Sequence, residues 1–184
     1  MTAMVQDAFM DIGNLIKTTD MEELKKFYDY YDMEISACKG SKRAEFIQSI
    51  KADLKPCNVV SVRDLFTKEQ IKIMETLVER KQCFGNSFRI ADVIRHWDGS
   101  IKYVEGRVLV ANFLPIEHAW NKVGDKYFDA TFELALGYDV TQESYAMLQE
   151  YKVSKVREVL LERGYYGEIY YEEKANEFFK GYKK

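Results

Sequence analysis

The apolar positions in the first part of the chain recur every three or four residues, a spacing typical of helices. This pattern predicts a helix over about residues 3–17 and a second one from Thr19 to about Tyr31. Thr19-Asp20-Met21-Glu22 has the form of a capping box, in which the first and fourth residues cap the helix start. A loop through Lys39-Gly40-Ser41 leads to a further helix, with Phe46, Ile47 and Ile50 among its apolar residues.

Two more helices are predicted before the pattern changes. Thr67-Lys68-Glu69-Gln70 is a second capping box and begins a helix whose apolar side runs from Ile71 to Val78. After a short break, Cys83 begins another helix, which we expect to end at Trp97-Asp98-Gly99 because Asp-Gly is a turn signal.

The following segment is rich in strand-forming residues. Residues 101–114 read as a strand in which Gly106 indicates a bulge or bend. Two further strands are predicted at about 117–123 and 126–133, joined through Gly124-Asp125. A long helix is then expected from Thr141 to about Arg163. Helices followed by antiparallel strands predict an α+β fold.

Length and composition define the broad class. The chain has 184 residues, of which 47% are hydrophobic, and a formal net charge of −3, so globular folding is expected. We divide it into a helical N-terminal region, residues 1–60, and a core with C-terminal helices, residues 61–184. A chain of this size forms one compact domain, with or without a small helical annex.

Several function classes are disfavoured. No apolar run approaches the ~20 residues that span a bilayer, and Asp7 and Asp11 interrupt the N-terminus where a signal peptide would be apolar. A slightly acidic chain lacks the basic field of a general nucleic-acid binder. Three cysteines at irregular spacing do not form a disulfide framework. We therefore expect a cytoplasmic protein with neither a membrane segment nor a nucleic-acid partner.

One histidine lies in an informative setting. His118 is in a predicted strand, and Asp129 follows 11 residues later on the returning strand of the same hairpin. Cross-strand neighbours lie roughly 5 Å apart, so the two side chains can face each other. A carboxylate there accepts the imidazole N–H, selects its tautomer and stabilises its charged form.

Cys83 supplies a candidate nucleophile. It stands where a helix begins, and a helix N-terminus favours the thiolate form of a cysteine. The backbone N–H of Cys83 can stabilise an oxyanion, with the side-chain amide of Gln82 or Asn86 assisting. Cys83, His118 and Asp129 thus form a nucleophile, a base and an orienting group.

The motifs around these residues resemble a known family. Four strings carry the likeness: Cys83-Phe84-Gly85-Asn86-Ser87, Tyr103-Val104-Glu105-Gly106, His118-Ala119-Trp120 and Asp129-Ala130-Thr131. Over about residues 80–135 they resemble the transglutaminase-like branch of the papain-fold cysteine proteases, in which a helix bearing the cysteine packs on an antiparallel sheet bearing the histidine and aspartate. The resemblance implies a Cys83–His118–Asp129 triad that works through an acyl-enzyme. Ala130 departs from the proline common in the family, which bears on the local turn.

The resulting expectation is a cysteine-dependent hydrolase or acyltransferase that acts on an amide of a protein, a peptide or a small molecule. Gln82, Asn86 and Trp120 are its predicted oxyanion and substrate-binding residues, and no cofactor or metal is expected, because the ligands lack a CxxC or HxxxH pair. One alternative is a catalytically inactive protein of the same fold that binds a protein partner. Another takes residues 20–54, which resemble a SAP-type helix–loop–helix, as a DNA-contacting module.

Overall fold

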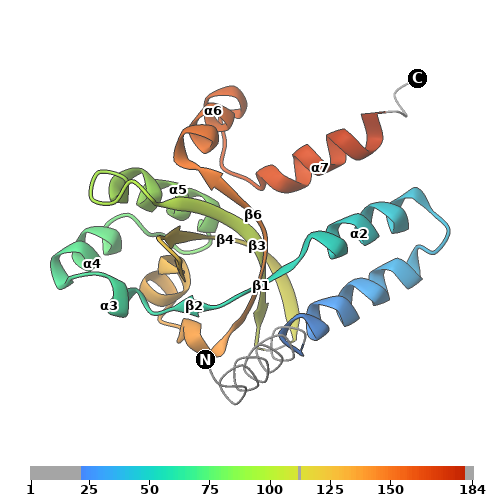
Figure 1. The fold of residues 1–184 in the computed structure, drawn as a ribbon, viewed down its shortest axis with the longest axis horizontal. Helices are drawn as coiled ribbons and strands as arrows, with labels where there is room; N and C mark the ends of the chain where they lie inside the picture. Colours follow the sequence, from blue (N-terminus) through green and yellow to red (C-terminus); the bar gives the residue numbers. More distant parts are fainter. Residues whose placement is uncertain (1–21, 112, 181–184) are drawn as a thin grey trace, which may run out of the picture. The chain divides into compact units, whose positions relative to one another are not determined.

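The computed structural model describes residues 22–111 and 113–180, and the chain divides into two compact units, Met1–Pro56 and Cys57–Lys184 (Figure 1). The predicted helix over residues 3–17 and the Thr19 cap lie outside the described residues. Within the described ranges, no helix is both long enough and apolar enough to cross a membrane.

In the first unit, residues 22–53 form two helices joined by a turn. Residues 22–37 are helical, so the predicted helix continues past Tyr31, and α2 spans Lys42–Asp53. The turn between them uses Gly40, whose φ of +78° suits a residue without a Cβ. Ser41 caps α2 because its Oγ accepts the N–H of Ala44 at 3.2 Å. The buried residues of the two helices follow the predicted pattern and include Leu24, Phe27, Tyr31, Phe46, Ile47 and Ile50.

The second unit combines a sheet with several helices, and β1 (Lys55–Cys57) spans the division between the units. The predicted Thr67 capping box is confirmed at the start of α4. In chain order the elements are β2 (Val59–Val60), α3 (Val62–Leu65), α4 (Lys68–Glu75), α5 (Cys83–Ile94), β3 (Lys102–Val110), β4 (Leu114–Val123), β5 (Lys126–Phe128), η1 (Thr131–Leu136), η2 (Val140–Gln142), β6 (Ser144–Lys152), α6 (Val153–Arg163) and α7 (Ile169–Phe179).

The sheet is mixed. Within the second unit the strand order is β6-β3-β4-β5-β2, and the pairs β6-β3, β3-β4 and β4-β5 are antiparallel. The prediction of an antiparallel sheet is wrong at one edge, because β2 runs parallel to β5. The predicted irregularity at Gly106 is confirmed, since the register of β3 against β6 shifts between Glu105 and Gly106.

Helices α5 and α6 pack on the strands that carry the candidate site. Helix α5 contacts β3 and β4, and α6 contacts β6, β3 and α5. Ile90, Ala91 and Ile94 of α5 share a buried cluster with Phe128 and Ala130, which flank Asp129 in the sequence. Burying this apolar face of α5 fixes the helix beside the hairpin that bears His118. The chain is therefore an α+β protein.

Two sequence predictions are wrong in detail. The expected helix over 141–163 begins only at Val153, because residues 144–152 form β6 and pair with β3. Ala, Met, Leu, Gln and Glu in this stretch favour a helix locally, and pairing with a central strand overrides that preference. The expected strand over 126–133 stops at Phe128, after which the chain turns into η1.

Candidate active site

His118 and Asp129 form a buried pair at the centre of the second unit. His118 lies on β4, and Asp129 directly follows the last residue of β5. Their side chains meet with Nε2 of His118 2.6 Å from Oδ2 of Asp129. Both residues are buried, so water does not screen the interaction. The Nε2–H of the imidazole donates to the carboxylate, which holds the ring in one orientation.

The Asp129 carboxylate is itself fixed by three further donors. Its Oδ1 accepts the backbone N–H groups of Thr131 at 3.0 Å and Phe132 at 3.1 Å, at the start of η1. Its Oδ2 accepts the hydroxyl of Tyr145 at 3.0 Å. Hydrogen bonds to the ionised form compensate a buried carboxylate for its lost hydration. Asp129 is thereby kept as a rigid acceptor for His118.

Cys83 approaches the same imidazole from helix α5. It is the first residue of α5 and is half-buried. Its thiol lies close enough to His118 to help raise the pKa of the imidazole. Because Nε2 faces Asp129, Nδ1 is the ring nitrogen left for the thiol. The three residues therefore lie in the order thiol, imidazole, carboxylate.

The environment favours a charged imidazole. Burial alone would lower the pKa of His118, but the charge and hydrogen bond of Asp129, together with Cys83, raise this pKa to about 10. At neutral pH the ring is thus an imidazolium with a buried carboxylate on one side and a thiol on the other. Such a cation stabilises a neighbouring thiolate, which is the nucleophilic form of cysteine.

The Asn86 amide anchors the start of α5. Its Nδ2 donates to the carbonyl of Glu79 at 2.7 Å and to the hydroxyl of Thr131 at 3.1 Å. Its Oδ1 accepts from the backbone N–H of Glu79 at 3.0 Å and from Arg89 at 2.6 Å. Both donors and the acceptor of this buried amide are thus in use. Asn86 thus ties the Cys83 helix to the segment after Asp129, and its amide is engaged in these contacts.

The two other predicted binding residues lie in different settings. Gln82 is exposed at the N-cap of α5, next to the backbone N–H of Cys83. Trp120 is 0% exposed, and its ring stacks on His118 with centroids 6.2 Å apart. Phe132 contacts His118 with ring centroids 4.4 Å apart. The rings of Trp120 and Phe132 therefore pack against the imidazole of His118 inside the protein.

Sequence reasoning missed two positioning residues. Tyr145 of β6 donates its hydroxyl to Asp129 and so orients the carboxylate, but the prediction placed Tyr145 on a helix. Asn121 donates from Nδ2 to the carbonyl of Ser87 at 2.9 Å and so ties α5 to β4. Nothing in the sequence set Asn121 apart from Glu117 and Lys122, the other polar residues of this strand.

Within residues 22–111 and 113–180, no group of three or more His, Cys, Asp and Glu side chains is arranged to hold a metal ion. A scan against models of protein families found no match, and neither did searches of curated proteins and of solved structures. Function is therefore inferred from the residues and the geometry of this chain.

Proposed function

We propose that the protein is a cysteine-dependent hydrolase or acyltransferase that acts on an amide through Cys83. One observation carries the proposal: the Cys83 thiol at a helix start lies close enough to His118 to act on its charge, and a ring nitrogen of His118 bonds to a buried carboxylate. The three side chains support one another, because the Asp129 carboxylate orients the His118 ring and this ring stabilises the Cys83 thiolate. A reducing, cytoplasmic setting would keep Cys83 in the thiol form.

The first half of the reaction forms an acyl-enzyme. The Cys83 thiolate attacks the carbonyl carbon, and the negative charge moves to the carbonyl oxygen. The backbone N–H of Cys83 has no hydrogen-bond partner within α5, because Cys83 is the first residue of the helix. This N–H donates to the oxyanion, and Gln82 assists it. The C–N bond then breaks, and the His118 imidazolium gives its proton to the departing amine.

The second half releases the acyl group. His118, now neutral, takes a proton from water, and the resulting hydroxide attacks the thioester carbon. The C–S bond breaks, the carboxylic acid leaves, and the thiolate–imidazolium pair is restored. An amine in place of water makes the same step an acyl transfer. Asp129 stays ionised throughout and keeps His118 aligned for both proton transfers.

The resemblance to the transglutaminase-like branch of the papain-fold enzymes is part of the proposal. Its support is the order of the elements: Cys83 begins a helix, His118 lies on a strand, and Asp129 follows the next strand. Ala130, the departure from the family's proline, has a φ of −70°, which lies within the range to which proline is locked. The turn after Asp129 thus has the backbone conformation at residue 130 that a proline would impose.

An activated ester tests acyl transfer without knowledge of the natural substrate. With p-nitrophenyl acetate, we expect an acetyl group on Cys83, located by mass spectrometry, followed by its hydrolysis. The variants Cys83→Ser and His118→Asn should lower turnover by roughly a hundred-fold or more, because each removes the nucleophile or its base. Cys38→Ser alters another half-buried cysteine, so it is the matched control and should keep the full rate. Equal turnover by the Cys83→Ser and Cys38→Ser variants would contradict the proposal.

A further inference from the structure

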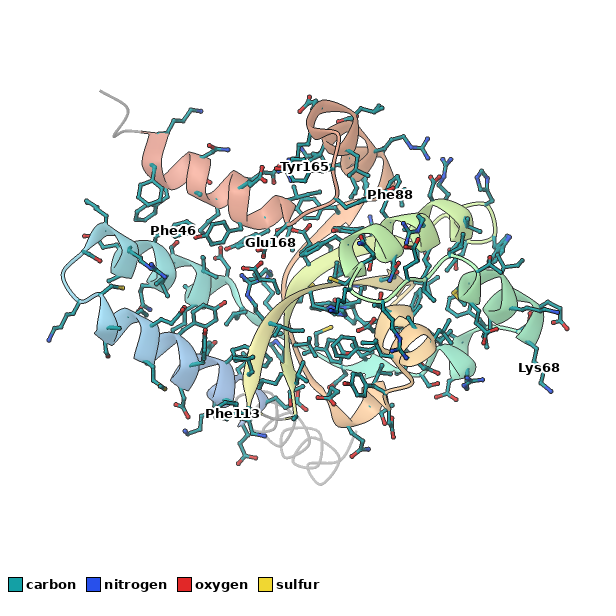
Figure 2. All side chains as sticks on the ribbon, turned by 180° about the vertical axis from the view of Figure 1, so that it is seen from behind. Phe46, Lys68, Phe88, Phe113, Tyr165 and Glu168 are labelled. Atoms are coloured by element: carbon teal, nitrogen blue, oxygen red, sulfur yellow. The ribbon has the colours of Figure 1, made fainter. Side chains whose placement is uncertain are left out.

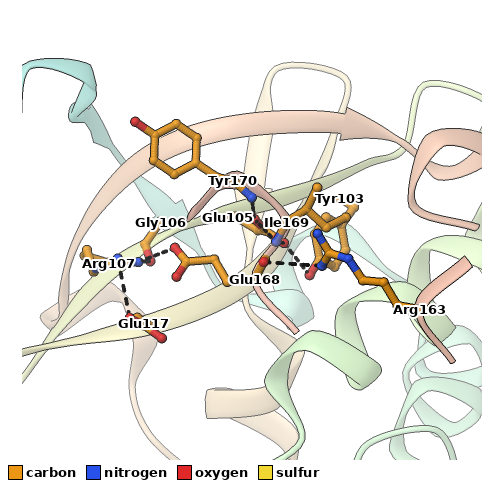
Figure 3. A network of polar contacts seen from close by, with 9 residues as sticks. All are labelled: Tyr103, Glu105, Gly106, Arg107, Glu117, Arg163, Glu168, Ile169 and Tyr170. Atoms are coloured by element: carbon orange, nitrogen blue, oxygen red, sulfur yellow. Dashed lines mark hydrogen bonds and ion pairs between the residues drawn. The ribbon is translucent and has the colours of Figure 1, made fainter. Parts of the chain in front are cut away.

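The first turn of α7 is held by a side chain of another element. The N-cap residue of α7, Glu168, directs its carboxylate to Arg107 of β3, which donates at 2.6 Å (Figure 3). Glu105, also on β3, accepts the backbone N–H of Ile169 at 2.9 Å and that of Tyr170 at 2.8 Å. The first N–H groups of a helix have no acceptor within the helix. Glu105 therefore supplies the cap of α7.

The contacts of Glu105 suit a neutral carboxyl group. The side chain is buried, and its Oε1 accepts the hydroxyl of Tyr103 at 3.0 Å. When the carboxyl group carries a proton on Oε1, this bond reverses and the Tyr103 oxygen accepts it. The other oxygen, Oε2, still accepts the N–H groups of Ile169 and Tyr170. The neutral form thus keeps a partner for all three groups and avoids burying a charge.

The ionised form of Glu105 is costly at this position. Burial raises the pKa of Glu105 from 4.5 to about 7, against the opposing effect of the N–H groups of Tyr170 and Ile169, and the charge of Glu168 adds to the rise. When the first turn of α7 moves away, water reaches the carboxyl group and its pKa returns towards 4.5. The docked helix therefore binds the proton more tightly than the open one. Docking is strongest below about pH 4.5 and weakens as the pH rises to about 7.

Other titratable and charged groups surround the junction. Burial raises the pKa of Tyr103 and that of Tyr151 above 10, so both hydroxyls stay protonated in this range. Burial also raises the pKa of Glu168, against the charge of Arg107. Further groups near the junction are Cys83 of α5, Glu117 of β4, Arg163 of α6, and Glu172 and Glu173 of α7. Glu105 and Glu168 are thus the two carboxyl groups here whose pKa values burial raises.

The link between α6 and α7 can act as a hinge. Residues 164–168 join the two helices, and Figure 2 labels Tyr165 and Glu168 within them. Gly164 has a φ of +76°, which suits a residue without a Cβ, and Gly167 is a second glycine in the same link. Rotation at these glycines moves the first turn of α7 away from β3 while α6 stays in place.

We propose that Glu105 is a pH-responsive latch: its neutral carboxyl group holds the first turn of α7 on β3, and loss of its proton loosens that turn. Ile169 is 2% exposed and shares a buried cluster with Tyr103, against which Phe84 of α5 packs. Opening the latch therefore loosens a contact of the helix that bears Cys83. The latch goes beyond the proposed function and operates whether or not Cys83 is a nucleophile.

Hydrogen exchange of the amides that Glu105 accepts tests the latch directly. The protection of the Ile169 and Tyr170 amides, measured by NMR and corrected for the intrinsic exchange rate, reports opening of the first turn of α7. In the wild type we expect this protection to fall roughly ten-fold or more between about pH 5 and about pH 7.5. It should also stay below the protection of the slowest amides of β4, which exchange only when the whole unit unfolds. A flat profile, or protection equal to that of β4, would overturn the inference.

Three variants assign the response to one carboxyl group. Glu105→Gln resembles the neutral form, because its amide keeps an oxygen for the N–H groups, and its protection should stay within about three-fold over this pH range. The control Glu150→Gln alters a carboxylate of β6 that pairs with Lys122 and should follow the wild type. Glu168→Gln alters the neighbouring carboxylate and should keep most of the wild-type fall.

Two results from these variants would contradict the latch. One is a full wild-type fall in Glu105→Gln, which would show that another group controls the first turn of α7. The other is the loss of the fall in Glu168→Gln, which would assign the response to Glu168. This second result is decisive even where Glu105→Gln does not fold.

Discussion

At the scale of single residues, the candidate site depends on a histidine that lies between the Asp129 carboxylate and the Cys83 thiol. His118 is enclosed by Trp120 and Phe132, and its Nε2 bonds to Asp129 at 2.6 Å. The His118–Asp129 contact was predictable from the hairpin spacing. The role of Tyr145 was not, because its bond to Asp129 joins residues whose proximity arises only when β6 pairs with β3.

The raised pKa of His118 predicts a pH dependence of stability. A histidine whose pKa rises on folding from 6.5 to about 10 stabilises the fold while it is protonated. That contribution is complete below pH 6.5 and is lost as the pH rises through about 10. In urea titrations, the free energy of unfolding should therefore fall between these pH values more steeply for the wild type than for His118→Gln.

The second histidine provides the control for that measurement. His96 is exposed, and His96→Gln should follow the wild-type pH profile. If His118→Gln and the wild type lose stability in parallel over this window, the buried imidazolium is not formed.

At the scale of elements, the strand β3 organises the second unit. It pairs with β4 along its whole length and with β6 from Lys102 to Leu109, and it carries Glu105 and Arg107, which hold the start of α7. Its bulge was predicted from Gly106, because a glycine inside a strand marks such a site. The pairing partner β6 was mistaken for a helix, because its local composition favours one and only the long-range ladder decides otherwise.

Gly106 is expected to tolerate no side chain. A Cβ at this position would overlap the carbonyl oxygen of Ala146 and lie 2.6 Å from Cη2 of Trp120. Because the first of these atoms is backbone, relief requires movement of the strand. Gly106→Ala should lower the free energy of unfolding by about 1–3 kcal/mol, measured by thermal or urea denaturation.

A second glycine serves as the reference. A Cβ at Gly99 meets no atom within 4 Å, so Gly99→Ala should stay within about 0.5 kcal/mol of the wild type. Similar losses from the two substitutions would show that β3 and β6 do not approach as closely as described.

At the scale of the whole molecule, the groups assigned to the reaction all lie in the unit Cys57–Lys184. Composition and periodicity predicted an α+β chain with a helical start, and the hairpin spacing predicted that His118 and Asp129 would meet. The sequence did not predict the hydrogen bonds that hold the surrounding elements in place. Asn86, Asn121 and Glu105 act through backbone groups of other elements, and such contacts leave no periodic signal in the chain.

The relative reactivity of the three cysteines tests the central claim most directly. Cys38 and Cys83 are both half-buried, so Cys38 is an internal reference of similar access, whereas Cys57 is buried. Under iodoacetamide at neutral pH, with each site followed by mass spectrometry, Cys83 should react at least about five-fold faster than Cys38. His118→Asn should reduce Cys83 to the rate of Cys38. Equal, slow labelling of all three thiols in the wild type would contradict Cys83 as the nucleophile.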